Sequence, residues 1–179
     1  MLKRGSDIIG LPVICLEDNS KKGKVKDILF DQQTMNLKAL LVDEGGLMHS
    51  CRFIHYHNIS SFDDNVITVQ KSSFVEHVPI HYKASFQFHG RQDILDLEVL
   101  TEEGQNIGMV QDLLFDIDRG KITALILTDG LFHDLIEGRP LLPLVDSVSF
   151  KDFSVIVPQE MKNEVQYHTG GLKKILSLE

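Results

Sequence analysis

Gly23-Lys-Val-Lys-Asp-Ile-Leu-Phe-Asp31 and Gly108-Met-Val-Gln-Asp-Leu-Leu-Phe-Asp116 are two versions of one segment, and this repetition decides the fold. They lie 85 positions apart and share the glycine, the valine, both aspartates and the Leu-Phe pair. The match continues without a gap, because Leu37-Lys-Ala-Leu-Leu-Val42 aligns with Ile122-Thr-Ala-Leu-Ile-Leu127 at the same offset. Self-similarity at a fixed offset is typical of a duplicated structural unit.

The repeated unit extends beyond these segments in both directions. Upstream, Gly10-Leu-Pro-Val-Ile14 corresponds to Asp96-Leu-Glu-Val-Leu100, and downstream Val66-Ile-Thr-Val69 corresponds to Val155-Ile-Val157. After Pro158 the sequence predicts a helical turn or two. We therefore predict a first domain over residues 1–70, a packed linker over 71–92, a second domain over 93–158 and a C-terminal tail over 159–179.

Each unit is expected to consist of short strands. Apolar residues cluster in short runs, and polar stretches such as Glu102-Glu-Gly-Gln-Asn106 supply turn residues between them. Closure of the strands into a barrel would hide the sheet edges. The sequence therefore predicts an all-β fold of two tandem small antiparallel β-barrels with a short C-terminal helical tail.

The repeated segment also predicts an irregular strand. Val25 and Phe30 are five positions apart, as are Val110 and Phe115, so regular alternation would place the members of each pair on opposite faces. Either the strand carries a β-bulge near Asp27 and its counterpart, or one apolar residue makes a second contact. We favour the bulge.

The whole pattern resembles the PRC-barrel family. It consists of Gly-x-x-Val, a polar turn, Gly-x-Val-x-Asp followed by two apolar residues and Phe-Asp, and then an apolar Ala-Leu strand. That family includes the cytoplasmic domain of the reaction centre H subunit, the C-terminal domain of a ribosome maturation factor and tandem two-barrel bacterial proteins. The resemblance implies a small, strongly bent antiparallel barrel that makes protein contacts and has no shared catalytic residues.

Composition limits the function classes. The chain has 179 residues, 42% of them hydrophobic, and a net charge of -8. No apolar run approaches the roughly 18 residues of a membrane helix, so we expect a cytoplasmic protein without a transmembrane segment. The net charge disfavours long-range attraction to nucleic acid. We expect no sequence-specific nucleic-acid binding.

Four aspartates are the most evident candidates for acid–base or cation chemistry: Asp27, Asp31, Asp112 and Asp116. Their presence in both copies argues against that role, because an active site needs only one set. We therefore expect structural roles in turns and bulges. The sequence also contains no phosphate-binding loop, nucleophile elbow or dinucleotide fingerprint. We expect a protein that is not an enzyme and has no cofactor.

Histidine and cysteine give a weak pattern. His55 and His57 are two apart, so a strand would point both to one face, and His49 and Cys51 share that parity. Zinc sites normally take their ligands from separate elements, so we expect no metal site, although these histidines leave the question open. Cys15 and Cys51 are expected to be reduced structural thiols.

Two surface features are candidate partner contacts. Residues 1–70 hold 8 basic and 9 acidic residues, whereas residues 90–158 hold 5 basic and 13 acidic residues. The first domain is therefore nearly neutral and the second is acidic. Lys21, Lys22 and Lys24, with Lys26, crowd one hairpin of the first domain. The second feature is a loop with large apolar side chains, which are Leu131, Phe132 and Leu135. We favour packing of this loop between the two barrels, and contact with a partner protein or a second copy is the alternative.

The sequence therefore predicts a non-catalytic protein-binding or scaffolding module. We expect its partner to be a protein or a ribonucleoprotein, for example an assembling ribosomal subunit, and a homodimer contact remains an alternative. A small-molecule-binding or metal-binding regulatory protein is the second hypothesis, because histidines are frequent between His49 and His89.

Overall fold

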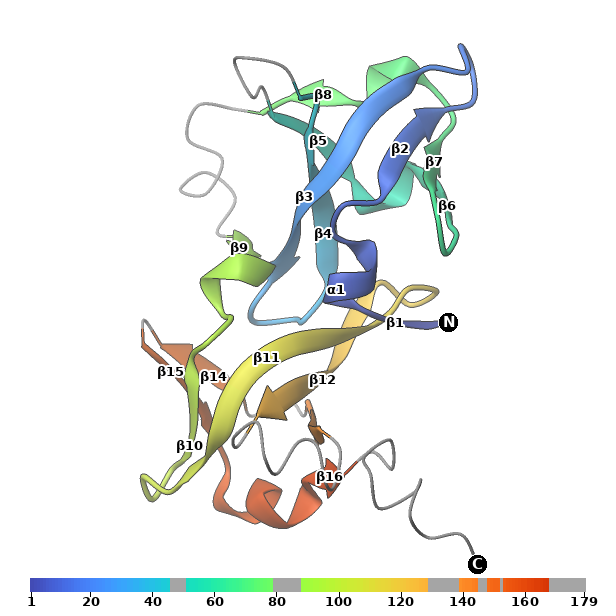
Figure 1. Ribbon diagram of the computed structural model, residues 1–179. Helices are drawn as coiled ribbons and strands as arrows, with labels where there is room; N and C mark the ends of the chain where they lie inside the picture. The colour runs from blue at the N-terminus through green and yellow to red at the C-terminus, as the bar shows by residue number, and fades with distance from the viewer. Residues whose placement is uncertain (46–50, 79–87, 129–138, 145–147, 152, 168–179) are drawn as a thin grey trace, which may run out of the picture. The chain divides into compact units, whose positions relative to one another are not determined.

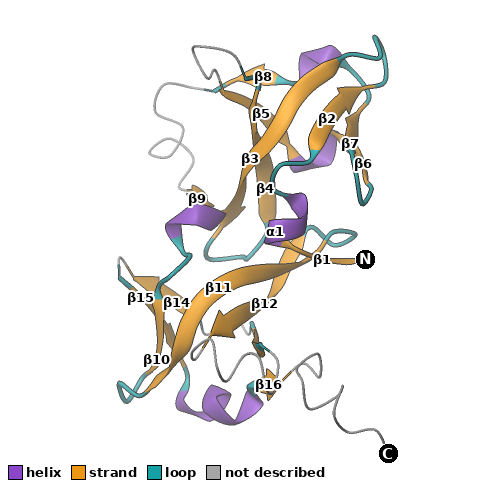
Figure 2. Cartoon of the chain, in the orientation of Figure 1, coloured by secondary structure: helices purple, strands orange, loops and turns teal. Residues whose placement is uncertain are grey.

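The computed structural model describes residues 1–45, 51–78, 88–128, 139–144, 148–151 and 153–167. The chain divides into two compact units. Unit 1 comprises Met1–Asp93 and Phe115–Lys121, and unit 2 comprises Ile94–Leu114 and Ile122–Glu179. Strands dominate both (Figure 2), and within the described residues every helix is too short or too polar to span a membrane.

The elements follow one another in chain order (Figure 1). The first part contains β1 (Leu2–Arg4), α1 (Gly5–Ile8), β2 (Pro12–Cys15), β3 (Lys21–Asp31), β4 (Leu37–Asp43), β5 (Cys51–His55), β6 (Ile59–Phe62), β7 (Ile67–Val69), β8 (Glu76–His77) and β9 (Phe88–Gly90). The second part contains β10 (Glu98–Thr101), β11 (Asn106–Asp116), β12 (Lys121–Thr128), β13 (Pro140–Pro143), β14 (Ser149–Lys151), β15 (Ser154–Val157) and β16 (Gln166–Tyr167). Short 3₁₀ turns lie at Tyr56–Asn58, Ser72–Phe74, Arg91–Asp93 and Gln159–Glu164.

The two sheets have the same strand order, which confirms the duplication. The first sheet runs β6-β7-β2-β3-β4-β5-β8, and β9 pairs with β3 beside this path. The second runs β14-β15-β10-β11-β12-β13-β16, and β1 pairs with β11. Among the strand pairs whose register is described, β2 with β7 and β10 with β15 are parallel, whereas the neighbouring hairpin pairs are antiparallel. Both copies therefore follow one connection pattern.

The long strands β3 and β11 carry matching β-bulges opposite β2 and β10. The register between β2 and β3 shifts after Val13, and the register between β10 and β11 shifts after Val99. At these bulges Gly23 has a φ of 134° and Gly108 a φ of 136°. Side chains rarely adopt such a conformation, which is why both copies have glycine there.

A second bulge in β3 explains how Val25 and Phe30 both reach the interior. The register with β4 shifts between Val25 and Asp27, so the predicted bulge is confirmed in this copy. Val25 is 2% exposed and Phe30 is fully buried. In β11, Val110 and Phe115 are fully buried as well.

The linker and the tail pack where they are described. Val78 covers a small cluster formed by Leu29, Ala39 and Phe53, as expected of an apolar linker. After Pro158, the 3₁₀ turn Gln159–Glu164 confirms the predicted helical start of the tail, and its Met161 is buried.

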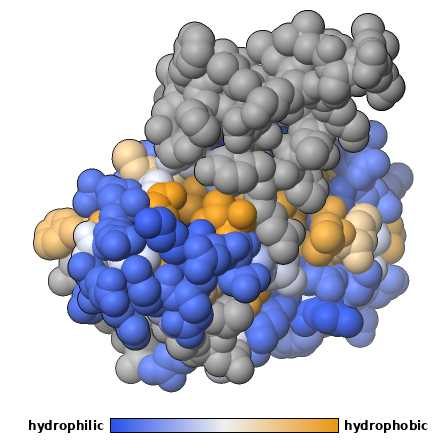
Figure 3. Space-filling view, turned by 90° about the horizontal axis from the view of Figure 1, so that it is seen from below, coloured by the Kyte–Doolittle hydropathy of each residue, from blue (hydrophilic) through white to orange (hydrophobic). Residues whose placement is uncertain are grey.

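Hydrophilic residues cover much of the face shown in Figure 3, beside a smaller group of hydrophobic ones.

Candidate functional site

Asp31 and Asp116 form equivalent turns. One carboxylate oxygen of Asp31 accepts hydrogen bonds from the backbone N–H groups two and three residues further along the chain, both at 2.9 Å. Asp116 accepts the equivalent bonds at 3.1 and 3.3 Å. Aspartate is favoured in turns because its side chain can bond its own backbone in this way. The duplication of these two residues therefore has a structural reason.

Asp27 and Asp112 are the buried members of the duplicated set, 6% and 3% exposed. Each accepts a hydrogen bond from the N–H of the next residue, at 2.8 and 2.7 Å. Asp27 also accepts one from the N–H of Gln92 at 3.4 Å, and a Cβ on Gly90 would lie 2.2 Å from its Oδ2. Asp27 thus contacts the segment that contains β9, which is an architectural role.

Asp31 gives a prediction that separates its charge from its hydrogen bonds. The backbone N–H of Thr34 holds the pKa of Asp31 below its usual value. A carboxylate of this kind stabilises the fold above its unfolded pKa of about 3.9, and the stabilisation is lost as the pH falls through the folded pKa. Asp31→Asn keeps an acceptor oxygen but not the charge, so at pH 7 we expect it to lose only the stability that wild type loses on protonation of this carboxyl, and to lose less further stability than wild type between about pH 4 and pH 2.

The matched variant removes the acceptor. Asp31→Ala is expected to lower the free energy of unfolding at pH 7 by about 1 kcal/mol, because both turn hydrogen bonds are lost. Urea unfolding at several pH values measures both variants. Equal stability of Asp31→Asn and Asp31→Ala at pH 7 would contradict the role of these hydrogen bonds.

The histidine pattern is only partly described. His55 and His57 have stacked rings with centroids 5.3 Å apart, and His55 also meets the edge of Phe53 at 4.7 Å. His49 lies outside the described residues. Within the described part of the chain, histidine, cysteine and acidic side chains do not gather into a group of three or more that could hold a metal ion.

Three of the hairpin lysines form what we call the lysine strip: Lys21, Lys24 and Lys26. All three are exposed on β3, where Val25 between them points into the core. Lys22 does not belong to the strip, because its Nζ lies 2.9 Å from a carboxylate oxygen of Asp18 and its side chain is only 19% exposed. A shallow hollow of about 210 Å³ lies beside Lys21 and Lys24.

The other predicted surface cannot be placed. Leu131, Phe132 and Leu135 lie outside the described residues. Among the described side chains, the large apolar ones that are exposed are scattered along the chain, and they are Met1, Leu2, Leu16, Met109 and Phe153.

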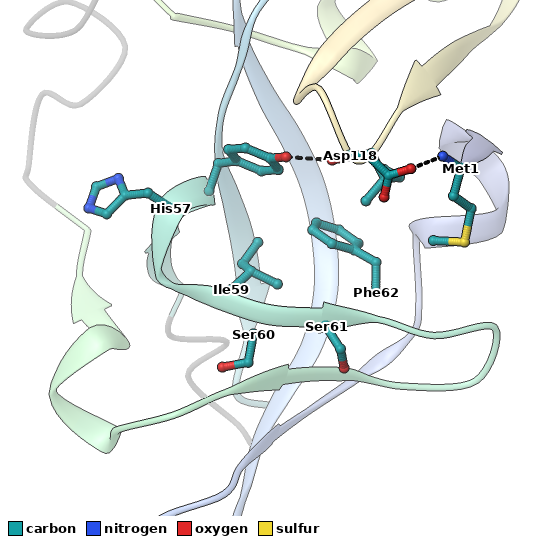
Figure 4. A pocket seen from close by; sticks show the side chains of 9 residues that line it. Met1, His57, Ile59, Ser60, Ser61, Phe62 and Asp118 are labelled. Carbon is teal, nitrogen blue, oxygen red and sulfur yellow. Dashed lines mark hydrogen bonds and ion pairs between the residues drawn. The ribbon is translucent and has the colours of Figure 1, made fainter.

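A pocket of about 320 Å³ lies in unit 1 beside Tyr56 (Figure 4). All four residues of β6 line it, together with Met1, Tyr56, His57, Ile117 and Asp118. The Tyr56 hydroxyl donates a hydrogen bond to the carbonyl oxygen of Ile117, and the Met1 ammonium binds the Asp118 carboxylate. Burial raises the pKa of the Tyr56 phenol, and the charges of Asp118 and Asp116 raise it further.

Comparison with known proteins decides the family. The PRC-barrel domain model matches residues 2–74 and again residues 87–160. The chain belongs to the PRC-barrel family. It is also 30% identical over 148 residues to YrrD of Bacillus subtilis (strain 168), a protein described as uncharacterized, and the match covers 82% of each chain. The resemblance seen in the sequence is therefore confirmed, including the presence of two PRC-barrel copies.

The two PRC-barrel copies differ in the lysine strip. At the offset of 85, the strip positions Lys21, Lys24 and Lys26 correspond to Asn106, Met109 and Gln111 on β11. The burial pattern along the two strands is nearly the same, with the first and fourth residues exposed in both. The second PRC-barrel copy thus presents an uncharged version of the same surface.

Sequence reasoning missed the pocket beside Tyr56. Its two sides come from residues near position 60 and from the turn at Ile117 and Asp118. A Cβ on Gly120 would lie 2.5 Å from the Tyr56 ring, so the ring rests on this turn. In the sequence, the residues around Ile117 look like an ordinary β-turn. Nothing in the sequence indicates that this turn contacts Tyr56, 61 residues earlier in the chain.

Proposed function

We propose that this protein is a non-catalytic binding module that docks on an acidic surface of a partner protein through the lysine strip of its first PRC-barrel copy. The observation that carries this proposal is the unpaired charge of the strip. In the described part of the chain, no carboxylate lies within ion-pair distance of the Nζ atoms of Lys21 and Lys24. The Nζ of Lys26 lies 3.5 Å from the Cys51 sulfur.

The position of these charges favours recognition of a partner over a contribution to stability. An exposed lysine that has no partner in its own fold adds little to the free energy of folding, whereas complementary charge on another protein accelerates and orients association. The chain as a whole has a net charge of -8, which repels acidic partners. The lysine strip is a local group of positive charges that can attract them.

A protein surface fits the strip better than RNA does. Aromatic side chains that stack on bases are the usual companions of lysine in single-stranded RNA sites. The exposed residues of β3 include no such ring, since the aromatic residue of this strand, Phe30, is fully buried. A ribonucleoprotein would on this account be contacted through its protein component or through its phosphates without sequence preference.

The test gives the first copy the residues of the second. The triple variant Lys21→Asn, Lys24→Met, Lys26→Gln should retain its fold and lose at least about tenfold in partner capture from a native extract at low salt. A control variant with Lys71, Lys121 and Lys151 changed to glutamine removes the same charge from other exposed positions. It should capture the partner as wild type does.

Quantitative mass spectrometry of the captured proteins measures the difference, with and without ribonuclease. Loss of a specific protein in the strip variant alone, insensitive to ribonuclease, supports the proposal. Equal capture by the strip variant and wild type would contradict it, and capture that disappears with ribonuclease would assign the strip to RNA phosphates.

A further inference from the structure

We propose that the pocket beside Tyr56 binds a primary ammonium group on a short alkyl chain. This inference is independent of the lysine strip and adds a second binding site to unit 1. Asp118 would hold the ammonium group, and the rings of Tyr56 and Phe62 would contact the alkyl chain.

The walls of the pocket suit an alkyl chain. The Tyr56 and Phe62 rings lie with their centroids 6.3 Å apart and are tilted by 36°. Ile59 and Phe62 point from β6 toward the side of the pocket where Asp118 lies (Figure 4). β6 lies at one end of the strand order and is therefore an edge strand of its sheet. The pocket volume of about 320 Å³ is at the small end of ligand sites, which limits the occupant to a short chain.

An exposed carboxylate at the pocket can bind a cation. The Asp118 side chain is 73% exposed, and its carboxylate already binds one ammonium group, that of Met1. The second carboxylate nearby, Asp116, lies 3.7 Å from the same nitrogen and 3.5 Å from the guanidinium of Arg119. Asp118 is therefore the carboxylate that a second ammonium group can reach.

The Tyr56 hydroxyl helps to define this specificity. It donates its hydrogen to the Ile117 carbonyl, so the pocket wall presents the ring of Tyr56 and not a free donor. An aromatic ring beside a carboxylate attracts an ammonium group through both its negative face and the neighbouring charge. An anionic ligand could reach the Met1 ammonium only by displacing Asp118 from it, and the negative faces of the Tyr56 and Phe62 rings would disfavour it.

The same chemistry has two natural sources, which are a free alkyl amine and a lysine side chain on an extended segment of another protein. Either would compete with the Met1 ammonium for Asp118. We therefore expect weak binding, with a Kd of about 1 to 10 mM for a minimal amine, because a small ligand has few atoms with which to gain affinity.

Titration of the full chain by amide NMR tests the proposal. The probes are n-butylammonium, butyrate and an N-acetylated, C-amidated Ala-Lys-Ala peptide, at constant ionic strength. We expect saturable shifts at Tyr56, Ile59 and Ile117 with n-butylammonium, and none with butyrate. Saturation by the peptide at tenfold lower concentration would assign the site to a protein lysine, whereas tighter binding of the free amine would assign it to a small molecule.

Two variants make the outcome decisive. Asp118→Asn is exposed enough to leave the fold intact and should weaken the binding of n-butylammonium at least fivefold. Glu103→Gln removes another exposed carboxylate, from the turn between β10 and β11, and should leave binding unchanged. Shifts that do not saturate, or that respond equally to Asp118→Asn and Glu103→Gln, would overturn the proposal.

Discussion

Replacement of Gly23 by alanine is expected to lower the free energy of unfolding by at least about 3 kcal/mol. A Cβ at this position would lie 2.3 Å from the carbonyl oxygen of Asp43, which belongs to the paired strand β4 and cannot move without breaking the sheet. The backbone φ of 134° adds strain of its own. For a chain of this length, the change corresponds to a melting temperature lower by about 10 °C.

Gly104→Ala is the matched control. Gly104 also has a positive φ, 81°, but nothing lies within 4 Å of the position that its Cβ would take. We expect a loss of only about 1 kcal/mol, from the conformational strain alone. Thermal or urea unfolding measures both variants. If Gly23→Ala and Gly104→Ala lose the same stability, the close approach of β3 to β4 at the bulge is refuted.

Phe30→Ala is expected to lower the free energy of unfolding by about 3 to 5 kcal/mol. Phe30 is fully buried and is among the largest side chains of the interior. It reaches the interior together with Val25 because β3 carries a bulge between Val25 and Asp27. Without that bulge, alternation along the strand would turn one of the two toward the other face.

Phe153→Ala provides the comparison, since Phe153 is 86% exposed. The same change of side chain should alter the free energy of unfolding by less than about 0.5 kcal/mol there. Equilibrium denaturation with guanidinium measures both. A small effect of Phe30→Ala with a large effect of Val25→Ala would mean that the strand alternates regularly and that the bulge is absent.

The fold could be predicted because the residues that determine it lie close together in the sequence and occur in both copies. The duplicated glycines mark the bulges at Gly23 and Gly108, and the spacing of Val25 and Phe30 indicates the second irregularity. Even the departure at Asp96 fits, because Asp96 has a φ of 64° where Gly10 has 86°. Aspartate tolerates this left-handed conformation better than most residues do.

The candidate sites were harder to predict, because they depend on contacts between distant residues. The four lysines look equivalent in the sequence, yet a bulge and a salt bridge to Asp18 separate Lys22 from the strip. The pocket requires Tyr56 to meet a turn 61 residues further along the chain. No periodicity or motif encodes such a contact.

The asymmetry of the two copies is the basis of the functional account. The copies share their strand order and their bulges, whereas the charges at corresponding exposed positions differ, as Lys24 and Met109 show. Residues that build the fold are present in both copies, and residues that contact a partner are needed in only one. On the proposed function, the lysine strip is what makes the first copy the one that binds a partner.

Site-specific photo-crosslinking in the native cells tests this central claim most directly. A benzophenone amino acid is placed at Lys24 in one variant and at the corresponding Met109 in another, so that backbone position and exposure are matched. The account predicts a crosslinked product of defined size from position 24, weakened by Lys21→Asn and Lys26→Gln, and none from position 109. Equal products from both positions, or a product from position 109 alone, would contradict it.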